Sequence, residues 1–297
     1  MKKTGFIAIV GRPNVGKSTL LNSILGEKVA IVSSKPQTTR NRIIGIHTVG
    51  DDQFVFLDTP GIFKPRNSLG SYMVKTANSS MQDADAVILV VDAGKPVSEI
   101  EKNVIKYVKN TETPSVLVLN KVDLYRREQI AETIAAYAEL HDFSAVVPIC
   151  AKNGKGVSEV LDECKPFLGE SEFFFPEDMV TDQSERQVAA EVIREKLLRT
   201  LNKEIPHGIA VAIEEFKDEG SLISIRAEIF CEKASHKGII IGKGAETLKK
   251  IGTYAREDIE KMLDTKVFLD LWVKVKENWR DNEFNLNNFG FNPKELD

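Results

Sequence analysis

Residues 11–18 read Gly-Arg-Pro-Asn-Val-Gly-Lys-Ser and follow directly on a short apolar stretch, Phe6–Val10. This spacing matches the phosphate-binding loop pattern, in which a strand, a glycine-rich turn and a helix succeed one another. The glycines let backbone N–H groups approach phosphate oxygens, and the start of the helix adds positive electrostatic potential. A chance match by composition alone is on the order of one per cent for a chain of this length. The stretch therefore predicts a P-loop nucleotide-binding domain.

The sequence around this loop alternates between apolar stretches and amphipathic segments. Apolar stretches of this kind form strands buried on both faces of a mostly parallel, doubly wound α/β sheet. The expected strands are Phe6–Val10, Ile43–Val49, Phe54–Leu57, Ala86–Val91, Val116–Leu119 and Ala145–Ile149. The expected helices are Lys17–Leu25, Leu69–Met81, Ser98–Lys109, Arg126–Leu140 and Val157–Phe167. We expect these elements to form one domain over residues 1–168.

The pattern changes after this domain. Residues 169–183 contain Phe173-Phe174-Phe175 and acidic residues, and we expect a linker whose aromatic rings dock on one domain. Residues 184–297 are expected to form a smaller α+β domain. Its expected elements are a helix from Ser184 to about Asn202, strands Gly208–Phe216 and Leu222–Cys231, a glycine-rich loop, a helix at about Thr247–Leu263 and a strand at Val267–Val275.

Side chains at the P-loop and at a neighbouring strand end are typical of a site for nucleotide phosphates and Mg²⁺. Lys17 would reach the β- and γ-phosphates, and the Ser18 hydroxyl would coordinate Mg²⁺. Asp58-Thr59-Pro60-Gly61 ends the strand Phe54–Leu57, so Asp58 would hold the Mg²⁺ shell through water. The Gly61 N–H would contact the γ-phosphate. These positions predict a site that responds to the terminal phosphate.

Hydrolysis is assigned to three residues, Lys17, Thr39 and Gly61. Thr38 and Thr39 lie in a polar stretch between the first helix and the next strand, and one of them, Thr39 in our interpretation, would complete the Mg²⁺ shell. Ile62 follows the Gly61 turn and cannot orient water through hydrogen bonds. Catalysis would then depend on stabilisation of phosphate charge and on a water placed by other groups. We expect slow intrinsic turnover.

Asn120-Lys121-Val122-Asp123 lies just after the apolar strand Val116–Leu119 and predicts that the base is guanine. A carboxylate there accepts from the ring N–H and the exocyclic amine of guanine, whereas adenine would leave it unpaired. Cys150-Ala151-Lys152 would pack its backbone against the base. The expected nucleotide-binding residues are Gly11, Asn14, Val15, Gly16, Lys17, Ser18, Thr19, Asp58, Gly61, Asn120, Lys121, Asp123, Ala151 and Lys152.

These motifs, in this order, resemble the translation-factor-related GTPases, and the Era family in particular. The resemblance is carried by Gly11–Ser18, Gln37-Thr38-Thr39-Arg40, Asp58–Gly61 and Asn120–Asp123. Asn14 stands where several GTPases that use K⁺ in place of an arginine finger carry an asparagine ligand. A role of Asn14 in shaping the loop is the equal alternative.

The C-terminal part contains the stretch His236-Lys237-Gly238-Ile239-Ile240-Ile241-Gly242-Lys243-Gly244, between a strand and a helix. It resembles the glycine loop with which KH domains clamp a nucleic-acid backbone beside a base-binding groove. The order of elements resembles a type II KH domain, and the resemblance to the Era family covers essentially the whole chain. Ala245 stands where the second glycine of the clamp belongs. An alanine there can begin the following helix, and Gly244 is the alternative position for close approach of the nucleic-acid backbone.

Local charge supports RNA as the partner of this domain. The stretch from Lys233 to Arg256 contains six basic residues and one acidic residue, Glu246. The formal net charge of the whole 297-residue chain is −4. A basic face on an acidic protein is the electrostatic feature expected of RNA binding, whereas lysines on an exposed helix are often only solvated. The expected RNA-binding residues are Lys237, Gly238, Gly242, Lys243, Gly244, Lys249, Lys250 and Arg256.

The resemblance implies a monomeric, cytoplasmic GTPase that uses Mg²⁺, binds the 3′ region of 16S rRNA and assists 30S subunit assembly. The three cysteines lack paired spacing, which fits a reducing cytosol. No stretch approaches the roughly 18 apolar residues of a membrane span, although peripheral membrane association stays open. One alternative is a membrane-associated or cell-cycle signalling GTPase whose C-terminal domain binds protein. Another is an RNA-binding module that uses GTP only structurally.

Overall fold

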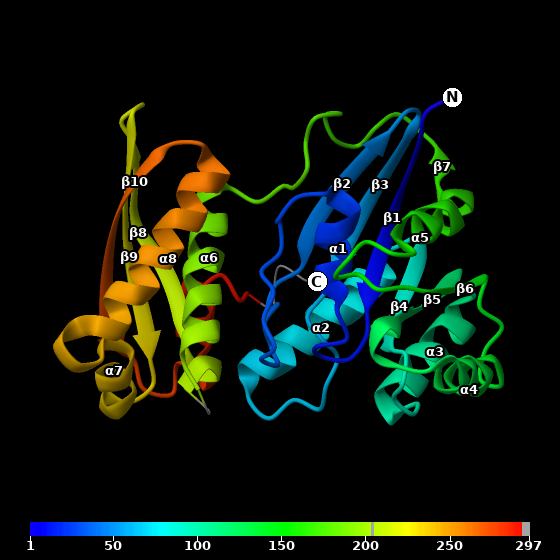
Figure 1. Ribbon diagram of the computed structural model, residues 1–297, viewed down its shortest axis with the longest axis horizontal. Coiled ribbons are helices and arrows are strands. Elements are labelled where there is room, and N and C mark those ends of the chain that lie inside the picture. The colour runs from blue at the N-terminus through cyan, green and yellow to red at the C-terminus, as the bar shows by residue number, and fades with distance from the viewer. Residues whose placement is uncertain (203–204, 293–297) are drawn as a thin grey trace.

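The structure is a computed structural model that describes residues 1–202 and 205–292 (Figure 1). An N-terminal α/β unit and a C-terminal α+β unit lie side by side, joined by a linker and by a returning C-terminal segment (Figure 1). All three cysteines are buried and free. Within the described part of the chain, no helix is both long enough and apolar enough to cross a membrane.

The N-terminal unit is built on one sheet with the strand order β2-β3-β1-β4-β5-β6, and β7 pairs with β1. Its strands are β1 (Lys3–Val10), β2 (Ile43–Val49), β3 (Asp52–Asp58), β4 (Ala86–Asp92), β5 (Ser115–Asn120), β6 (Ala145–Pro148) and β7 (Gly169–Glu170). The strands pair in parallel except β2 and β7. Strands β4 and β5 are buried along their whole length, as expected for apolar strands covered on both faces.

Helices cover both faces of this sheet, which confirms the doubly wound fold. They are α1 (Lys17–Leu25), α2 (Ser68–Gln82), α3 (Glu99–Thr111), α4 (Arg127–Ala138) and α5 (Val157–Cys164). One apolar cluster joins α1 and α5 to the sheet through Leu20 and Val160, and a second joins α3 and α4 through Val104 and Tyr137. Because parallel strands end at the same edge, the loops after β1, β3, β5 and β6 are brought together there.

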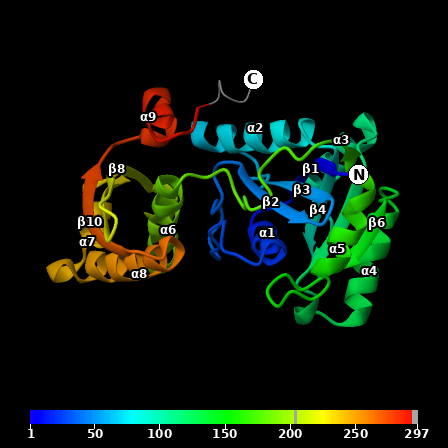
Figure 2. The same ribbon diagram turned by 90° about the horizontal axis from the view of Figure 1, so that it is seen from above.

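The C-terminal unit has a three-stranded sheet in the order β10-β9-β8, covered by helices on one face (Figure 2). Its elements are α6 (Glu185–Thr200), β8 (Ala210–Asp218), β9 (Leu222–Cys231), α7 (Ala234–Ile241), α8 (Glu246–Leu263), β10 (Lys266–Val275) and α9 (Glu283–Asn288). Strands β9 and β10 are parallel, and β8 and β9 are antiparallel. The expected order of helix, two strands, helix and strand is confirmed.

One part of the expected pattern is wrong. Residues 236–241, expected within a loop, belong to helix α7. Gly238 and three consecutive isoleucines disfavour a helix locally. However, Ile240 is fully buried in the core of the C-terminal unit, so packing overrides this preference.

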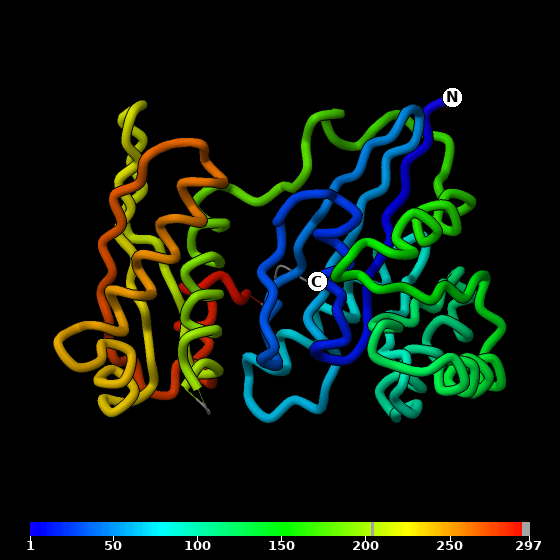
Figure 3. Tube along the Cα trace, viewed as in Figure 1, coloured from blue at the N-terminus to red at the C-terminus, as the bar shows by residue number. Residues whose placement is uncertain are grey.

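The linker runs along the N-terminal unit (Figure 3). Phe174 stacks on Phe6 with ring centroids 5.3 Å apart. The Gln53 amide oxygen accepts from the N–H groups of Phe174 and Phe175, at 2.9 and 3.1 Å. The N–H of Ile46 in β2 donates to the carbonyl of Val180. The linker aromatics are therefore docked on the N-terminal unit. The linker stays bound to this unit as far as Val180, close to the start of α6.

Two segments fix the units to each other. Helix α6 faces the chain between α1 and β2, where the buried carboxylate of Glu195 meets Lys28 at 2.6 Å. The returning segment 276–292 carries α9 to the start of α2 (Figure 2). There, Trp279 and Phe291 share an apolar cluster with Tyr72 of α2. The units are therefore joined through the two regions that flank the P-loop site.

Candidate nucleotide site and nucleic-acid groove

The P-loop crosses the end of β1 and opens α1, as its sequence predicts. Gly11 has φ +149°, and a side chain there would meet the carbonyl oxygen of Val90 at 2.3 Å. Gly16 has φ +105°, and a side chain there would meet the amide nitrogen of Asn120 at 2.1 Å. Both positions therefore require glycine, which packs the loop tightly and leaves its N–H groups free to face a phosphate.

Lys17 is buried at the first position of α1. Its ammonium group donates to the carbonyls of Arg12, at 3.1 Å, and Gly11, at 3.4 Å. Burial lowers the pKa of Lys17 to about 8, against the opposing field of Asp58. A phosphate would supply the missing countercharge, so this lysine is poised to hold one.

Three oxygen-bearing side chains converge beside Lys17. The Ser18 hydroxyl donates to Asp58 Oδ2 at 2.6 Å and lies 2.8 Å from the Thr39 hydroxyl. Asp58 Oδ1 is buried and has no hydrogen-bond partner among the described residues. Burial raises the pKa of Asp58 to about 6, although Lys17, Ser18 and Thr39 favour its charged form. A set of hard oxygen donors with one unsatisfied carboxylate oxygen fits Mg²⁺.

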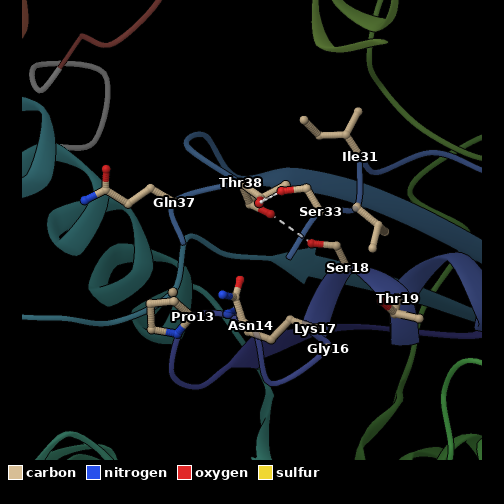
Figure 4. Close-up of a pocket in the computed structure, with 13 residues that line it drawn as sticks. Pro13, Asn14, Gly16, Lys17, Ser18, Thr19, Ile31, Ser33, Gln37 and Thr38 are labelled. Carbon is tan, nitrogen blue, oxygen red and sulfur yellow. Dashed lines mark hydrogen bonds between the residues drawn. The ribbon is translucent and has the colours of Figure 1, made fainter. Parts of the chain in front are cut away.

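Residues 31–39 close over the P-loop and enclose a cavity of about 50 Å³ (Figure 4). Thr39, rather than Thr38, lies beside Ser18; the Thr38 hydroxyl instead contacts Ser33 Oγ at 2.8 Å and the Lys35 carbonyl at 2.7 Å. Ser33 and Gln37 also line this cavity, and the sequence did not single them out as site residues. Gln37 had entered only as part of the motif Gln37–Arg40, and Ser33 only through the polar character of the stretch.

Asn14 and Thr19 line the same cavity (Figure 4). The Asn14 amide donates from Nδ2 to the Ser34 carbonyl at 2.9 Å. This bond engages the nitrogen, and among the described residues the amide oxygen has no hydrogen-bond donor, so it can accept from water or coordinate a cation. Asn14 also has φ +64°, so it shapes the loop as well.

The turn after β3 lies against the opposite side of the P-loop. A side chain at Gly61 would meet the backbone nitrogen of Pro13 at 2.7 Å. The N–H of Ile62 donates to the Gly11 carbonyl at 3.0 Å. The Ile62 side chain packs against an apolar cluster, so it does not supply a polar group to the phosphate cavity.

The loops after β5 and β6 meet beside the P-loop. Asn120 donates to the Val15 carbonyl at 2.8 Å and accepts from the N–H of Ala151 at 3.0 Å. The Lys121 ammonium group bonds the Asn14 carbonyl at 2.8 Å and Asp92 at 3.0 Å. Asp92, at the end of β4, was not predicted from the sequence. These bonds join three loops into one rigid rim.

Asp123 lies on this rim within a short 3₁₀ turn and is exposed, while Lys152 is exposed in the turn after β6. Burial, and then a hydrogen bond from the thiol to the Asp123 carboxylate, raise the pKa of Cys150. The thiol thus helps to orient the carboxylate expected to read the base. The Cys150 contact was not predicted, because a weak S–H donor leaves no pattern in the sequence.

A separate groove of about 540 Å³ lies between α8 and β10 in the C-terminal unit. Its lining includes the basic residues Lys249 and Arg256 of α8 and the apolar Leu269 and Leu271 of β10. Phe268, at 60% exposure, also lines it and was not predicted. A lining with apolar, basic and aromatic side chains suits bases of a single-stranded nucleic acid.

The glycine loop lies at one end of this groove. Gly242 and Gly244 have φ +75° and +58°, and Lys243 between them is exposed. Ala245 was expected to begin the helix, and this is wrong: it has φ +63° and precedes α8 in a left-handed conformation. The loop therefore uses an L-residue at a position that favours glycine.

The other basic residues lie outside the groove. Lys250 lines a second groove on the opposite side of α8, near Ile239. Lys237 and Gly238 lie on the exposed side of α7 rather than in a loop. None of the five basic side chains singled out for RNA forms a salt bridge among the described residues: Lys237, Lys243, Lys249, Lys250 and Arg256.

Each half of the chain matches a known protein family. A model of 50S ribosome-binding GTPases matches residues 6–121, and a KH-domain model matches residues 204–280. The chain is 51% identical to GTPase Era of Clostridium kluyveri over 292 residues, which cover 98% of this chain and 100% of the relative. It is 48% identical to GTPase Era of Clostridioides difficile over 297 residues, covering 99% and 100%.

Two solved structures match the whole fold. A variant of Aquifex aeolicus Era bound to GDP and AlF₄⁻ is 38% identical, with a TM-score of 0.94 over 98% of this chain and 99% of that one. Era in complex with MgGDPNP and nucleotides 1506–1542 of 16S ribosomal RNA is also 38% identical, with a TM-score of 0.95 over 98% and 100%. The similarity spans both units and the linker between them.

Proposed function

Because this chain belongs to the Era family of GTPases, we propose that it couples GTP hydrolysis to binding of 16S rRNA during assembly of the 30S subunit. The observation that carries the proposal is the pairing, on one chain, of the Ser18–Asp58–Thr39 phosphate site with the groove between α8 and β10. A closely similar protein holds MgGDPNP together with nucleotides of 16S rRNA.

In the proposed reaction, water attacks the γ-phosphorus of GTP, the bond to the bridging oxygen breaks, and GDP and phosphate leave. Lys17 holds the β- and γ-phosphates with its ammonium group, and the Gly61 N–H contacts the γ-phosphate. Ser18, Thr39 and Asp58, the last through water, would hold Mg²⁺. When bound, that ion neutralises phosphate charge.

The residue after the Gly61 turn is Ile62, which is apolar and packs against an apolar cluster rather than lining the cavity. No glutamine at this position therefore orients the attacking water. The chain therefore depends on charge stabilisation by Lys17 and backbone N–H groups, which is consistent with slow intrinsic turnover. We further propose that the Asn14 amide oxygen coordinates K⁺ beside the phosphates. Its support is the free acceptor left by the bond from Asn14 to Ser34.

For the base, we propose that Asp123 reads guanine, with Lys121, Asn120 and the backbone of Ala151 and Lys152 framing it. For RNA, we propose that the loop Gly242–Gly244 clamps the backbone while Lys249 and Arg256 neutralise phosphates beside the groove. Lys237, Lys243 and Lys250 would add longer-range attraction. A 3′ segment of 16S rRNA is the proposed target.

Crosslinking the full chain to RNA in cells and sequencing the fragments tests the assembly role. We expect fragments concentrated near the 3′ end of 16S rRNA, with an excess from immature small subunits. Crosslinks spread over unrelated RNAs, or found only on mature ribosomes, would contradict the proposal. Release of phosphate from GTP by the purified chain tests the enzymatic part separately.

A further inference from the structure

Asp92 is the last residue of β4, and the proposed reaction does not use it. It lies in register with Asn120 at the end of β5 and is 8% exposed. Its Oδ2 atom pairs with the Lys121 ammonium group at 3.0 Å. Burial opposes the charged form of this carboxyl, but hydrogen bonds from Tyr125 and Lys121 outweigh it and lower the pKa of Asp92. A charged aspartate therefore stands beside the loop that frames the base at neutral pH.

Lys121 is fixed at both of its ends. Its backbone is left-handed, with φ +66°, and its N–H donates to the side-chain oxygen of Asn120 at 2.8 Å. A left-handed backbone costs an L-residue about 1–2 kcal/mol, so surrounding contacts must hold it. At the other end, the ammonium group bonds Asp92 at 3.0 Å and the Asn14 carbonyl at 2.8 Å. The side chain of Lys121 thus extends from the loop after β5 to the P-loop.

Tyr125 supports the same carboxylate. It follows the 3₁₀ turn Val122–Leu124, which carries Asp123, and its hydroxyl bonds Asp92. The Tyr125 ring lies so close to Gly94 that a side chain at Gly94 would meet ring atom Cδ1 at 2.1 Å. Gly94 therefore leaves the space that the ring occupies. The hydroxyl is held on Asp92 by a segment that also carries the residue proposed to read the base.

These contacts bear on nucleotide affinity through the order of one side chain. A lysine side chain loses about 1.5–2 kcal/mol of rotamer entropy when it becomes fixed. A lysine that is already fixed before the nucleotide arrives makes binding tighter, because this loss is not added to the binding step. Without the Asp92 charge, the Lys121 ammonium group would keep one neutral acceptor among the described residues, the Asn14 carbonyl. A neutral acceptor holds an ammonium group less firmly than a carboxylate does.

We propose that Asp92 is a positioning residue for guanine-nucleotide binding, which holds Lys121 in the conformation that frames the base and braces the P-loop at Asn14. This inference rests on the proposed role of Lys121 at the base and deepens it. Asp92 acts through the Lys121 ammonium group rather than by touching the nucleotide. Removal of the Asp92 charge should therefore speed nucleotide release only while that ammonium group is present.

The release of fluorescently labelled GDP from the full chain with Mg²⁺, followed by stopped flow, tests this in a double-mutant cycle. Asp92→Asn keeps the shape of the side chain and removes its charge, while Lys121→Met keeps an apolar stem and removes the ammonium group. We expect Asp92→Asn to speed release at least about fivefold. In the Lys121→Met background, the same change should alter the rate less than about twofold.

A general loss of stability would act alike in both backgrounds, so equal effects there overturn the proposal. A wild-type rate in Asp92→Asn also overturns it. The matched control is Asp85→Asn, directly before β4, where Asp85 Oδ2 accepts from the N–H of Phe6 at 2.7 Å. An amide oxygen can replace this acceptor, so GDP release should be unchanged.

Tyr125→Phe is a milder second variant, because it removes only the hydroxyl that bonds Asp92. It should speed GDP release by a smaller factor than Asp92→Asn, and this effect should vanish in the Lys121→Met background. An equal effect of Tyr125→Phe in both backgrounds would contradict the path through Asp92 and Lys121. Failure of the wild-type chain to bind GDP would instead contradict the proposed function, so the two failures are distinguishable.

Discussion

The carboxylate of Glu195, in α6 of the C-terminal unit, accepts a hydrogen bond from the backbone N–H of Val32 at 3.0 Å. Val32 lines the phosphate cavity, so a residue of the RNA-binding half directly holds a segment that covers the nucleotide site. The same carboxylate is fully buried and pairs with Lys28 at 2.6 Å and with Arg199 at 3.0 Å. One side chain of the C-terminal unit thus holds the segment that covers the nucleotide site.

Glu195→Gln should weaken this connection, because the amide keeps one acceptor but loses the charge that pairs with Lys28 and Arg199. We expect the free energy of unfolding to fall by about 1–3 kcal/mol. Affinity for a GTP analogue should fall more than affinity for GDP, since the 31–39 segment covers the terminal phosphate. Urea unfolding and nucleotide titrations measure both.

The matched control for Glu195→Gln is Glu99→Gln on α3. Glu99 forms an exposed pair with Lys102, which contributes little to stability. The control should behave as wild type in both measurements. Indistinguishable results for the two variants would show that Glu195 does not connect the units.

The lowered pKa of Lys17 predicts a specific pH dependence of nucleotide binding. Below pH about 8 the lysine is protonated with or without nucleotide, so Lys17 causes no pH dependence of affinity there. Bound phosphates favour the ammonium form and raise its pKa, so above pH about 8 binding takes up a proton. GDP affinity should then fall by up to about tenfold per pH unit.

Calorimetry at several values of pH, in buffers of different ionisation enthalpy, measures this uptake. Lys17→Arg is the control, because a guanidinium stays charged across this range and should remove the pH dependence. An affinity for GDP that stays level from pH about 8 to about 9 would refute the assignment to Lys17.

The proposed K⁺ site predicts that GTP hydrolysis is faster in K⁺ than in Na⁺ at equal ionic strength. Asn14→Ala should erase the difference, because it removes the amide oxygen that the bond to Ser34 leaves free. The control is Asn153→Ala, in the turn after β6, which should keep the rate difference between K⁺ and Na⁺. Steady-state phosphate release gives the rates, and equal rates in both salts would leave Asn14 only a loop-shaping role.

The left-handed backbone of Ala245 predicts that a glycine at this position increases stability. A left-handed backbone costs an L-residue about 1–2 kcal/mol, part of which glycine loses again through its greater freedom in the unfolded chain. Ala245→Gly should therefore raise the free energy of unfolding by up to about 1 kcal/mol and tighten RNA binding. Ala255→Gly, at a buried position of α8, should lower stability instead. A destabilised Ala245→Gly protein would contradict the strained conformation.

Sequence patterns predicted the N-terminal unit well because its strands are continuous apolar stretches that end in charged or glycine-rich turns. Helix Lys17–Leu25 and strand Ile43–Val49 have the predicted bounds. The Ser18 hydroxyl meets Asp58 because the parallel strands β1 and β3 end at one edge, which the order of motifs already implied. Thr39 reaches Ser18 at the same edge because it precedes β2, which is antiparallel to β3.

Features that depend on tertiary contact could not be predicted in this way. Helix α7 forms against its local preference because Ile240 is buried. Asp92 and Cys150 act through neighbours that are distant in sequence. The bonds from Arg40 to the carbonyls of Ile209 and His207 form only when the two units dock.

We propose that RNA binds at the glycine loop beside the α8–β10 groove while GTP binds separately at the P-loop. Gly244 is the position for the test, because a side chain there meets no atom within 4 Å and aspartate tolerates its left-handed backbone. At Gly242, by contrast, a side chain would meet Thr247 Oγ1 at 2.3 Å and distort the loop.

The deciding measurement is the affinity for a fragment of the 16S rRNA 3′ region, determined by filter binding at several salt concentrations. Three proteins are compared: wild type, Gly244→Asp and the uncharged control Gly244→Asn. We predict that Gly244→Asp weakens RNA binding at least about tenfold, because it places a negative charge against phosphate. Gly244→Asn should weaken it far less, and GTP affinity should be unchanged in all three proteins. Wild-type RNA affinity in a folded Gly244→Asp protein would show that RNA does not bind at the glycine loop.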